Sequence, residues 1–379
     1  MTTALYVLAA ILMLGIMVTV HEAGHFFAAR LTGIPVKEFA IGFGPKILSW
    51  KSKKYETQFF LRLIPAGGYC MFYGEDDVEE KEKDDPRALG NYAVWKRFVT
   101  VLMGPVMNFF LALVVAAALF MAVGEDTGGA FGYAVVQSVG ENTPAARAGM
   151  QAGDVLLSVN GQDAAGLTPA DAPEALQGTG YMLSYLVNAY QPGDDPLTIG
   201  IQRGEDTLTV SLIPEYSETE GRYLMGIQTA IQYTPAYAAV GPLRAVRLGG
   251  QYCVQAGGAI LGALRDLVTT GKGFEESSGP VGIVQLIAEE TQRSAENSAL
   301  EAFVTYGELL VLISVNLGLF NLLPIPGLDG SRLIFLLIEG VRRKPVPRKV
   351  EAYVHMAGFV LLMGLMLVMT YKDILKIFR

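Results

Sequence analysis

Four apolar stretches, each about as long as a bilayer is thick, dominate this sequence of 379 residues. They cover residues 4–25, 98–123, 303–323 and 354–371. Because about 20 consecutive apolar residues cross the hydrocarbon core as a helix, each stretch predicts a membrane-spanning helix. The chain is 51% hydrophobic and only 17% charged, which is unusual for a water-soluble protein. We therefore expect a polytopic α-helical membrane protein with about four spans.

Lysine and arginine residues near the ends of these stretches predict the orientation in the membrane. The loop between Arg30 and Arg97 and the segment 331–350 are both rich in them. Since short basic loops remain on the cytoplasmic side, we expect both to be cytoplasmic. The long region 124–302 and both termini are then outside, although the basic C-terminal tail opposes this orientation.

The first apolar stretch ends in His21, Glu22, Ala23, Gly24 and His25. If the stretch is one helix, the two histidines are four residues apart and share a face. Two imidazoles in this arrangement can bind one Zn²⁺, with Glu22 beside the metal as a general base. The bare motif also fits a helix end that leaves the membrane, with polar side chains in the headgroup layer. Ionisable residues within a span are, however, functional candidates by default.

A third zinc ligand is expected at Asp329, in an apolar setting after a segment with two prolines and several glycines. Taken alone, Asp329-Gly330 is typical of a turn or of a helix N-cap. Together with His21 and His25, the aspartate completes two imidazoles and one carboxylate, which leaves a fourth tetrahedral position for water. The remaining histidine, His355, is interpreted as an interfacial residue.

The parts between the spans differ in pattern. Alternating residues around 55–63 indicate strands, with a turn at Pro65, Gly67 and Gly68. Residues 130–215 contain short β-like runs separated by turns, and 235–275 have apolar residues at helical spacing. The division we expect is 1–34 (first span), 35–97 (membrane-associated β-hairpin and charged loop), 98–123 (second span), 130–215 (mainly β domain), 216–302 (amphipathic helices), 303–341 (third span and the aspartate segment) and 354–371 (fourth span).

Other features of the sequence argue against certain functions or give little information about function. The net charge of −8 and the lack of basic runs interleaved with aromatics argue against nucleic-acid binding. Cys70 and Cys253 are expected on opposite sides of the membrane, so a disulfide between them is not expected. Asn108, deep in the second span, is interpreted as a helix-packing residue.

Taken together, the motifs resemble the bacterial site-2 proteases, the PDZ-bearing intramembrane zinc metalloproteases of peptidase family M50, of the regulator-of-sigma-E protease type. The residues that carry this resemblance follow one another over nearly the whole chain: H-E-A-G-H at 21–25, P-A-G-G-Y at 65–69, G-P-V-M-N at 104–108, a PDZ-like T-P-A-A-R-A-G-M and G-D-V-L-L-S-V-N-G at 143–161, G-P-V-G at 279–282 and N-L-L-P-I-P-G-L-D-G at 321–330. The sequence departs from the family at Cys70-Met71, where Val-Lys is usual, and in having one PDZ copy where relatives often have two.

The resemblance implies Zn²⁺ held by His21, His25 and Asp329, with Glu22 as general base. It implies that Asn321 helps to hold an unwound substrate. It also implies that 55–73 is a membrane-dipping hairpin that pairs with the substrate as an added strand. The substrate-contacting residues expected from this are Phe59, Leu61, Gly68, Tyr69 and Asn321.

The resemblance further implies a multi-pass protein of the bacterial cytoplasmic (inner) membrane, with the PDZ domain outside and the active site towards the cytoplasmic side. The expected substrates are single-span membrane proteins, either anti-sigma factors or remnant signal peptides, and the PDZ groove is expected to bind peptide termini. The alternatives are a membrane-anchored zinc protease that acts on soluble or misfolded proteins, and a non-catalytic PDZ scaffold or metal-handling transporter. An intact Glu22 argues against the non-catalytic alternative, because a binding site needs no base.

Overall fold

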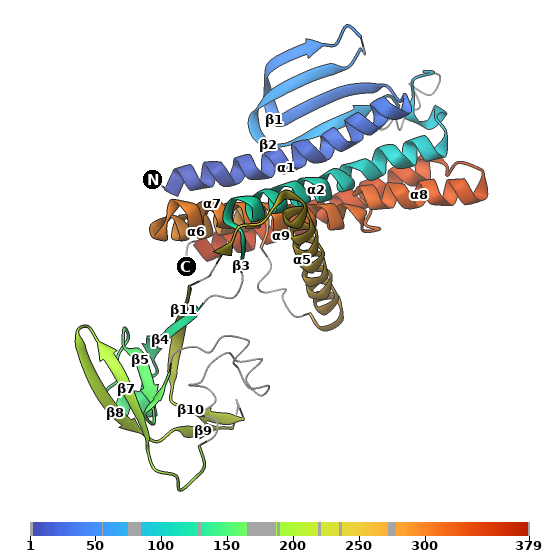
Figure 1. The fold of residues 1–379 in the computed structure, drawn as a ribbon. Helices are drawn as coiled ribbons and strands as arrows, with labels where there is room; N and C mark the ends of the chain where they lie inside the picture. Colours follow the sequence, from blue (N-terminus) through green and yellow to red (C-terminus); the bar gives the residue numbers. More distant parts are fainter. Residues whose placement is uncertain are drawn as a thin grey trace. The chain divides into compact units, whose positions relative to one another are not determined.

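The computed structural model describes residues 3–54, 56–74, 85–126, 130–164, 187, 190–218, 221–234, 237–271 and 278–377. The chain forms two compact units, one of residues 1–122 with 241–379 and one of residues 123–240 (Figure 1). The charged run at 75–84 and the middle of the expected β domain, residues 165–186, lie outside the described residues.

Four helices of the first unit are long and apolar enough to cross a membrane, which confirms the four expected spans. They are α1 (Thr3–Thr32), α2 (Val94–Val123), α7 (Ala299–Leu322) and α9 (Arg348–Ile377). At 1.5 Å per residue, even the 24-residue α7 is about 36 Å long, enough for a hydrocarbon core of about 30 Å. Leu5, Leu8, Leu12 and Ile16 of α1 are exposed at helical spacing, as expected for a lipid-facing stripe.

The spanning helices pack through small and aliphatic side chains. Ala112 and Ala116 of α2 form a buried cluster with Val311 and Val315 of α7. Small residues let helix backbones approach closely, and the van der Waals contacts made at this short distance help to stabilise the association of membrane helices. α1 packs in a second cluster against α7 and against α6 (Pro280–Asn297), the helix that precedes α7 and lies beside it in Figure 1.

A buried carboxylate joins α9 to the start of α6. Asp373 is 2% exposed and accepts hydrogen bonds from the backbone N–H groups of Gly279, at 3.2 Å, and Gly282, at 2.8 Å. The first N–H groups of a helix have no intrahelical acceptor, so a carboxylate placed there satisfies them and complements the helix dipole. The Gly279-Pro280-Val281-Gly282 segment is therefore a helix N-terminus that is capped from the last span.

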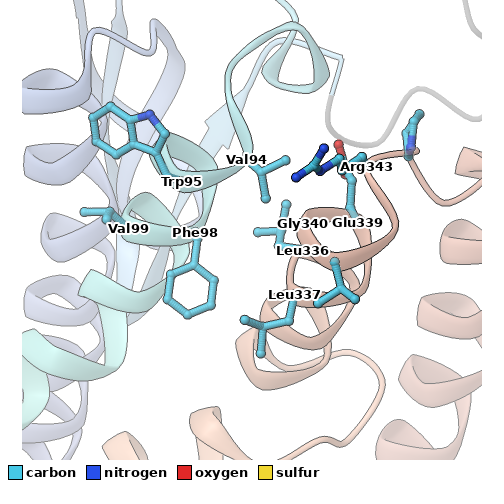
Figure 2. A pocket seen from close by; sticks show the side chains of 11 residues that line it. Val94, Trp95, Phe98, Val99, Leu336, Leu337, Glu339, Gly340 and Arg343 are labelled. Atoms are coloured by element: carbon cyan, nitrogen blue, oxygen red, sulfur yellow. The ribbon is translucent and has the colours of Figure 1, made fainter.

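The segment after α7 is interrupted, as its prolines predicted. α7 ends at Leu322, residues 323–328 form a loop, and α8 (Asp329–Arg342) begins at the aspartate. A pocket of about 640 Å³ lies between the C-terminal half of α8 and the first turns of α2. Figure 2 shows the side chains that line it. Trp95 and Phe98 line it from α2, and Leu336 and Leu337 from α8. At its edge Arg97 donates two hydrogen bonds to Glu339, a contact that ties the two helices together.

Between α1 and α2 the chain forms a sheet of two long, folded strands, β1 (Val36–Lys51) and β2 (Gln58–Phe72), which packs on α1 (Figure 1). The chain reverses at 52–57 and again between Leu61 and Gly68, because residues 58–61 run parallel to 38–41 whereas residues 68–72 run antiparallel to the same part of β1. The expected turn at Pro65, Gly67 and Gly68 is therefore confirmed, and it lies within β2. The first half of β1 is flanked on both sides by parts of β2, so that Phe39 is paired with both Phe59 and Cys70. Residues 68–72 thus form an outer segment, paired on one side only within the described residues.

The second unit is built around a sheet with strand order β11-β4-β5-β7-β8, with β6 also paired to β5. Its core is formed by inward-facing residues such as Val136, Leu156, Ile199 and Ile201, all almost fully buried. The strands are β4 (Ala130–Val139), β5 (Val155–Val159), β6 (Gln162–Asp163), β7 (Leu197–Arg203), β8 (Asp206–Leu212) and β11 (Ile227–Thr234). The short helix α3 (Pro144–Arg147) follows β4, and short pairs are formed by β9 (Glu215–Ser217) with β10 (Arg222–Leu224) and by β3 (Glu125–Asp126) with β12 (Tyr237–Ala238).

The expectation of amphipathic helices from 216 onwards is wrong for its first part. Residues 222–238 add strands to the second unit, and the helices begin only with α5 (Pro242–Thr270). The alternation in Ile227–Thr234 is the signal of a strand, and its partner is β4.

An ion pair lies at the edge of this core. Asp154 is fully buried and accepts hydrogen bonds from Nε and Nη2 of Arg203, at 2.7 and 2.8 Å, and from the backbone N–H of Gln151. These donors lower the pKa of the Asp154 carboxyl below its usual value, with the Arg203 hydrogen bonds as the main cause. Its contribution to stability is therefore present above about pH 4, the pKa of an unfolded aspartate, and is lost as the pH falls through the lower pKa of the folded state.

We predict that Asp154→Ala lowers the free energy of unfolding of this unit by about 2 kcal/mol at pH 7, because Arg203 loses its partner while remaining one-third exposed. The rate of limited proteolysis within 123–240 of the full chain measures this opening. The control is Glu215→Ala, which removes an ion pair with Arg147 whose side chains are both more than half exposed. Equal proteolysis rates for Asp154→Ala and wild type at pH 7 would contradict the prediction.

Candidate metal centre

The H-E-A-G-H segment lies within α1, so His21 and His25 project from one face of a single helix. Both are buried, at 6% and 8% exposure. Their rings meet edge to face with centroids 4.8 Å apart, and the two Nε2 atoms are 3.2 Å apart. The helical spacing predicted from sequence is confirmed.

The loop before α8 brings Asp329 to these histidines from more than 300 residues downstream. Oδ2 of Asp329 lies 3.0 Å from Nε2 of His21 and 3.3 Å from Nε2 of His25. The loop is held from α9, because the N–H of Gly327 donates to Nδ1 of His355 at 3.3 Å. His355 also lies 3.8 Å from Glu351 and is not part of the cluster, in line with its interpretation as a non-ligand.

The three side chains fit a tetrahedral zinc ion. Their ligand atoms lie within 4.8 Å of one another. Zn–N and Zn–O bonds of about 2.0–2.1 Å in tetrahedral geometry place ligand atoms about 3.3 Å apart, close to the separations of 3.0–3.3 Å found here. Oδ2 of Asp329 is buried and accepts no well-formed hydrogen bond from any described residue, as expected for an oxygen that serves a cation.

Gly104 of α2 provides the space that this arrangement needs. A Cβ atom at Gly104 would overlap the ring of His25 and press against that of His21. Gly24 makes the reciprocal approach, since a Cβ there would overlap the backbone carbonyl of Met103. The imidazoles therefore lie directly on the backbone of α2.

α2 also provides hydrogen-bond partners for the far side of both rings. Nδ1 of His25 lies 2.9 Å from the backbone carbonyl of Thr100, and Nδ1 of His21 lies 3.1 Å from the side-chain amide of Asn108. Sequence reasoning interpreted Asn108 only as a packing residue. Its depth in an apolar span was the available signal, because a polar side chain there needs a partner.

Glu22 points to the same region from the next position of α1. It is half-buried and interacts electrostatically with all three residues of the cluster and with the backbone of Cys70. Glu22 therefore lies between the cluster of His21, His25 and Asp329 and the outer segment 68–72 of the sheet.

The expected substrate residues are distributed less simply. Gly68 and Tyr69 lie in the outer segment, whereas the backbones of Phe59 and Leu61 are paired on both sides. A strand paired on both sides has no free edge, so an added strand could not pair with the backbone at 59 and 61. Contact of the Phe59 and Leu61 side chains with a substrate stays a prediction. Asn321 is half-buried in the last turn of α7. Among the described residues, it makes no hydrogen bond or ion pair with the cluster.

Comparison with known proteins agrees with this geometry. The model of the family described as Peptidase family M50 matches residues 9–365. A protein of Clostridium acetobutylicum, provisionally named as a zinc metalloprotease, is 32% identical and the match covers 96% of each chain. A similarly named protein of Clostridium perfringens is 33% identical over 98% of this chain and 99% of its own.

The regulator of sigma-W protease RasP of Bacillus subtilis is 30% identical, over 98% of this chain and 99% of its own. The match to the family model spans the H-E-A-G-H segment, the buried cluster and all but the end of the last span. The chain therefore belongs to peptidase family M50, a family of zinc-dependent metalloproteases.

Proposed function

We propose that this protein is an intramembrane endopeptidase in which His21, His25 and Asp329 hold zinc and Glu22 is the general base. The observation that supports this most is the depth of the cluster. His21 is eleven residues before Thr32, the end of α1, which is about 16 Å along the helix axis. Asn108, beside it, is fourteen residues after Val94, the start of α2. The cluster thus lies well inside two helices that are long enough to span the bilayer.

The chemistry follows from the donor set. Two imidazoles and one carboxylate would hold a zinc ion, which would supply a Lewis acid for peptide hydrolysis. Glu22 is placed to accept the proton of the attacking water and to return it to the leaving amine. The burial of the surrounding residues limits access of bulk water, which strengthens the electrostatic interactions inside the site.

Substrate binding is proposed to occur at the outer segment 68–72 of the sheet. Helical substrates hide their peptide bonds in internal hydrogen bonds, so they must unwind before cleavage. A free strand edge offers replacement partners for the unwound backbone. The backbone of Cys70 interacts with Glu22, so a strand added at this edge would lie next to the general base. Gly68 and Tyr69 belong to this edge, and Asn321 is proposed to hold the substrate from α7.

The remaining assignments follow the family and the basic loops. We propose a multi-pass protein of the bacterial cytoplasmic membrane, with the metal site towards the cytoplasmic side and residues 123–240 outside. The antiparallel sheet and the short α3 of that unit support a PDZ domain whose groove binds peptide termini. The proposed substrates are single-span membrane proteins, either anti-sigma factors or remnant signal peptides.

The zinc assignment predicts that His21→Ala, His25→Ala and Asp329→Ala each lower zinc content sharply from about one ion per chain, because three protein ligands share one metal. Zinc is measured in the purified, detergent-solubilised protein after dialysis. Asp266→Ala, at an exposed carboxylate of α5 outside the cluster, is the control and should retain the metal. Full retention by Asp329→Ala would show that another residue is the third ligand.

The proposed function is tested most directly by Glu22→Gln. Glutamine keeps the size and hydrogen bonding of the side chain but cannot accept the proton of water, so we expect zinc to be retained and cleavage to fall by about 10²-fold or more. The assay uses a single-span substrate reconstituted in micelles and, in parallel, an unfolded soluble protein. Near-normal cleavage by Glu22→Gln would refute the mechanism. Cleavage of only the soluble protein by wild type would refute the intramembrane assignment.

The outer segment is tested by Cys70→Pro, which removes the backbone N–H of the residue in this segment that interacts with Glu22. We expect loss of cleavage of a full-span substrate with zinc content unchanged, whereas Cys70→Ala should cleave normally. A short unstructured peptide separates two causes. If Cys70→Pro acted only through its contact with Glu22, cleavage of the peptide would fall as much as cleavage of the full-span substrate. If it acted through docking of the unwound substrate, cleavage of the peptide would fall less. Wild-type rates for Cys70→Pro on the full-span substrate would exclude docking at this edge.

A further inference from the structure

Asn108 is in an unusual environment for an amide in a membrane span. It is fully buried in the middle of α2. Its Nδ2 lies 3.1 Å from Nδ1 of His21, and its Oδ1 has no hydrogen-bond partner. Its backbone carbonyl accepts a hydrogen bond from Oγ of Ser314 on α7 at 2.9 Å, which fixes the position of this turn of α2. A buried carbonyl oxygen without a donor is costly, so this oxygen requires an explanation.

The chemistry of His21 supplies one. Nε2 of His21 faces Asp329 and His25, so Nε2 is the atom that points to the metal position. A neutral imidazole with its lone pair on Nε2 carries its hydrogen on Nδ1. That Nδ1–H needs an acceptor, and Nδ2 of Asn108 is a donor. Rotating the Asn108 amide by half a turn places Oδ1 opposite Nδ1–H. The rotation keeps the shape of the side chain and gives the unpartnered oxygen a donor.

We propose that Asn108 is a positioning residue that accepts the Nδ1–H of His21 through its carboxamide oxygen and so fixes the tautomer in which Nε2 is free to bind zinc. This inference rests on the proposed zinc site. The backbone carbonyl of Thr100 does the same for His25, at 2.9 Å from its Nδ1. Partners of this kind raise the basicity of the ligand and hold its ring in place.

The placement of these partners explains the spacing along α2. Thr100, Gly104 and Asn108 are four residues apart and therefore lie on one face of the helix. Gly104 gives both rings room, while the residues one turn before and one turn after it hold their Nδ1 atoms. One face of α2 thus orients two ligands that both come from α1.

Two substitutions distinguish an acceptor from a donor and from a packing residue. Asn108→Leu has a similar volume and no polar atom. Asn108→Asp has the same shape and can only accept when ionised. If Asn108 accepts from His21, we expect Asn108→Leu to weaken zinc binding by roughly 10- to 100-fold, and Asn108→Asp to stay within a few-fold of wild type. Affinity is measured on the full chain in micelles by competition with a chromogenic chelator.

Each alternative gives a different result. Unchanged affinity for Asn108→Leu would mean that the residue only packs. Equal loss in Asn108→Asp and Asn108→Leu would mean that its N–H₂ group is needed as a donor, and would overturn the proposal. The Co²⁺-substituted protein gives a second readout, because the visible absorption of Co²⁺ changes with ligand geometry. It should resemble wild type in Asn108→Asp and differ in Asn108→Leu.

Controls separate this proposal from folding and from the zinc site itself. Asn316 of α7 also has a buried side-chain oxygen without a hydrogen-bond partner. Among the described residues it makes no hydrogen bond with a histidine, so Asn316→Leu should leave zinc affinity unchanged. Size-exclusion profiles show whether each variant folds, and Asn108→Ala replaces Asn108→Leu if the latter aggregates. If His21→Ala retained zinc, the proposed site would be wrong. If His21→Ala lost zinc and Asn108→Leu kept it, only the present inference would fail.

Discussion

The close approach of α1 and α2 is the contact on which the rest of the site depends. It is possible because Gly24 lies against the backbone of Met103 and Gly104 lies against the two imidazoles. With larger residues at either position, the helices would have to separate and the rings would lose their partners on α2. Polar groups at this depth have no water to bind, so a loss of these partners would leave them uncompensated. The glycine in H-E-A-G-H is therefore a packing requirement, distinct from the chemistry of its neighbours.

The candidate ligands could be predicted from the sequence because their signals are local or chemically restrictive. His21 and His25 are separated by about one helical turn. Asp329 follows an apolar segment that contains two prolines, a setting in which few other acidic residues of the chain occur. The four spans follow from length and composition alone. These features do not depend on knowing which distant segments meet.

The features that sequence missed are those that depend on tertiary contacts. The turn at Pro65–Gly68 could be predicted from its local turn residues, but the pairing of both halves of β2 with the same half of β1 could not, because pairing over that distance leaves no local pattern. The same pairing places Phe59 between two neighbours and leaves Cys70 at an edge. Asn108 was interpreted as packing because nothing near it in sequence indicates an imidazole on another helix. Asp373 was not noticed for the same reason, since its partners lie at Gly279 and Gly282.

The pairing of β3 with β12 has a consequence for how the second unit is joined to the first. Tyr237 is paired with Asp126 and Ala238 with Glu125, so the chain enters and leaves this unit through two adjacent segments. Adjacent ends are the arrangement in which a whole domain is inserted or removed with least disturbance to its host. The second unit is thus an inserted domain between α2 and α5. Its exchange for another folded module with neighbouring termini would leave the connections of the membrane helices intact.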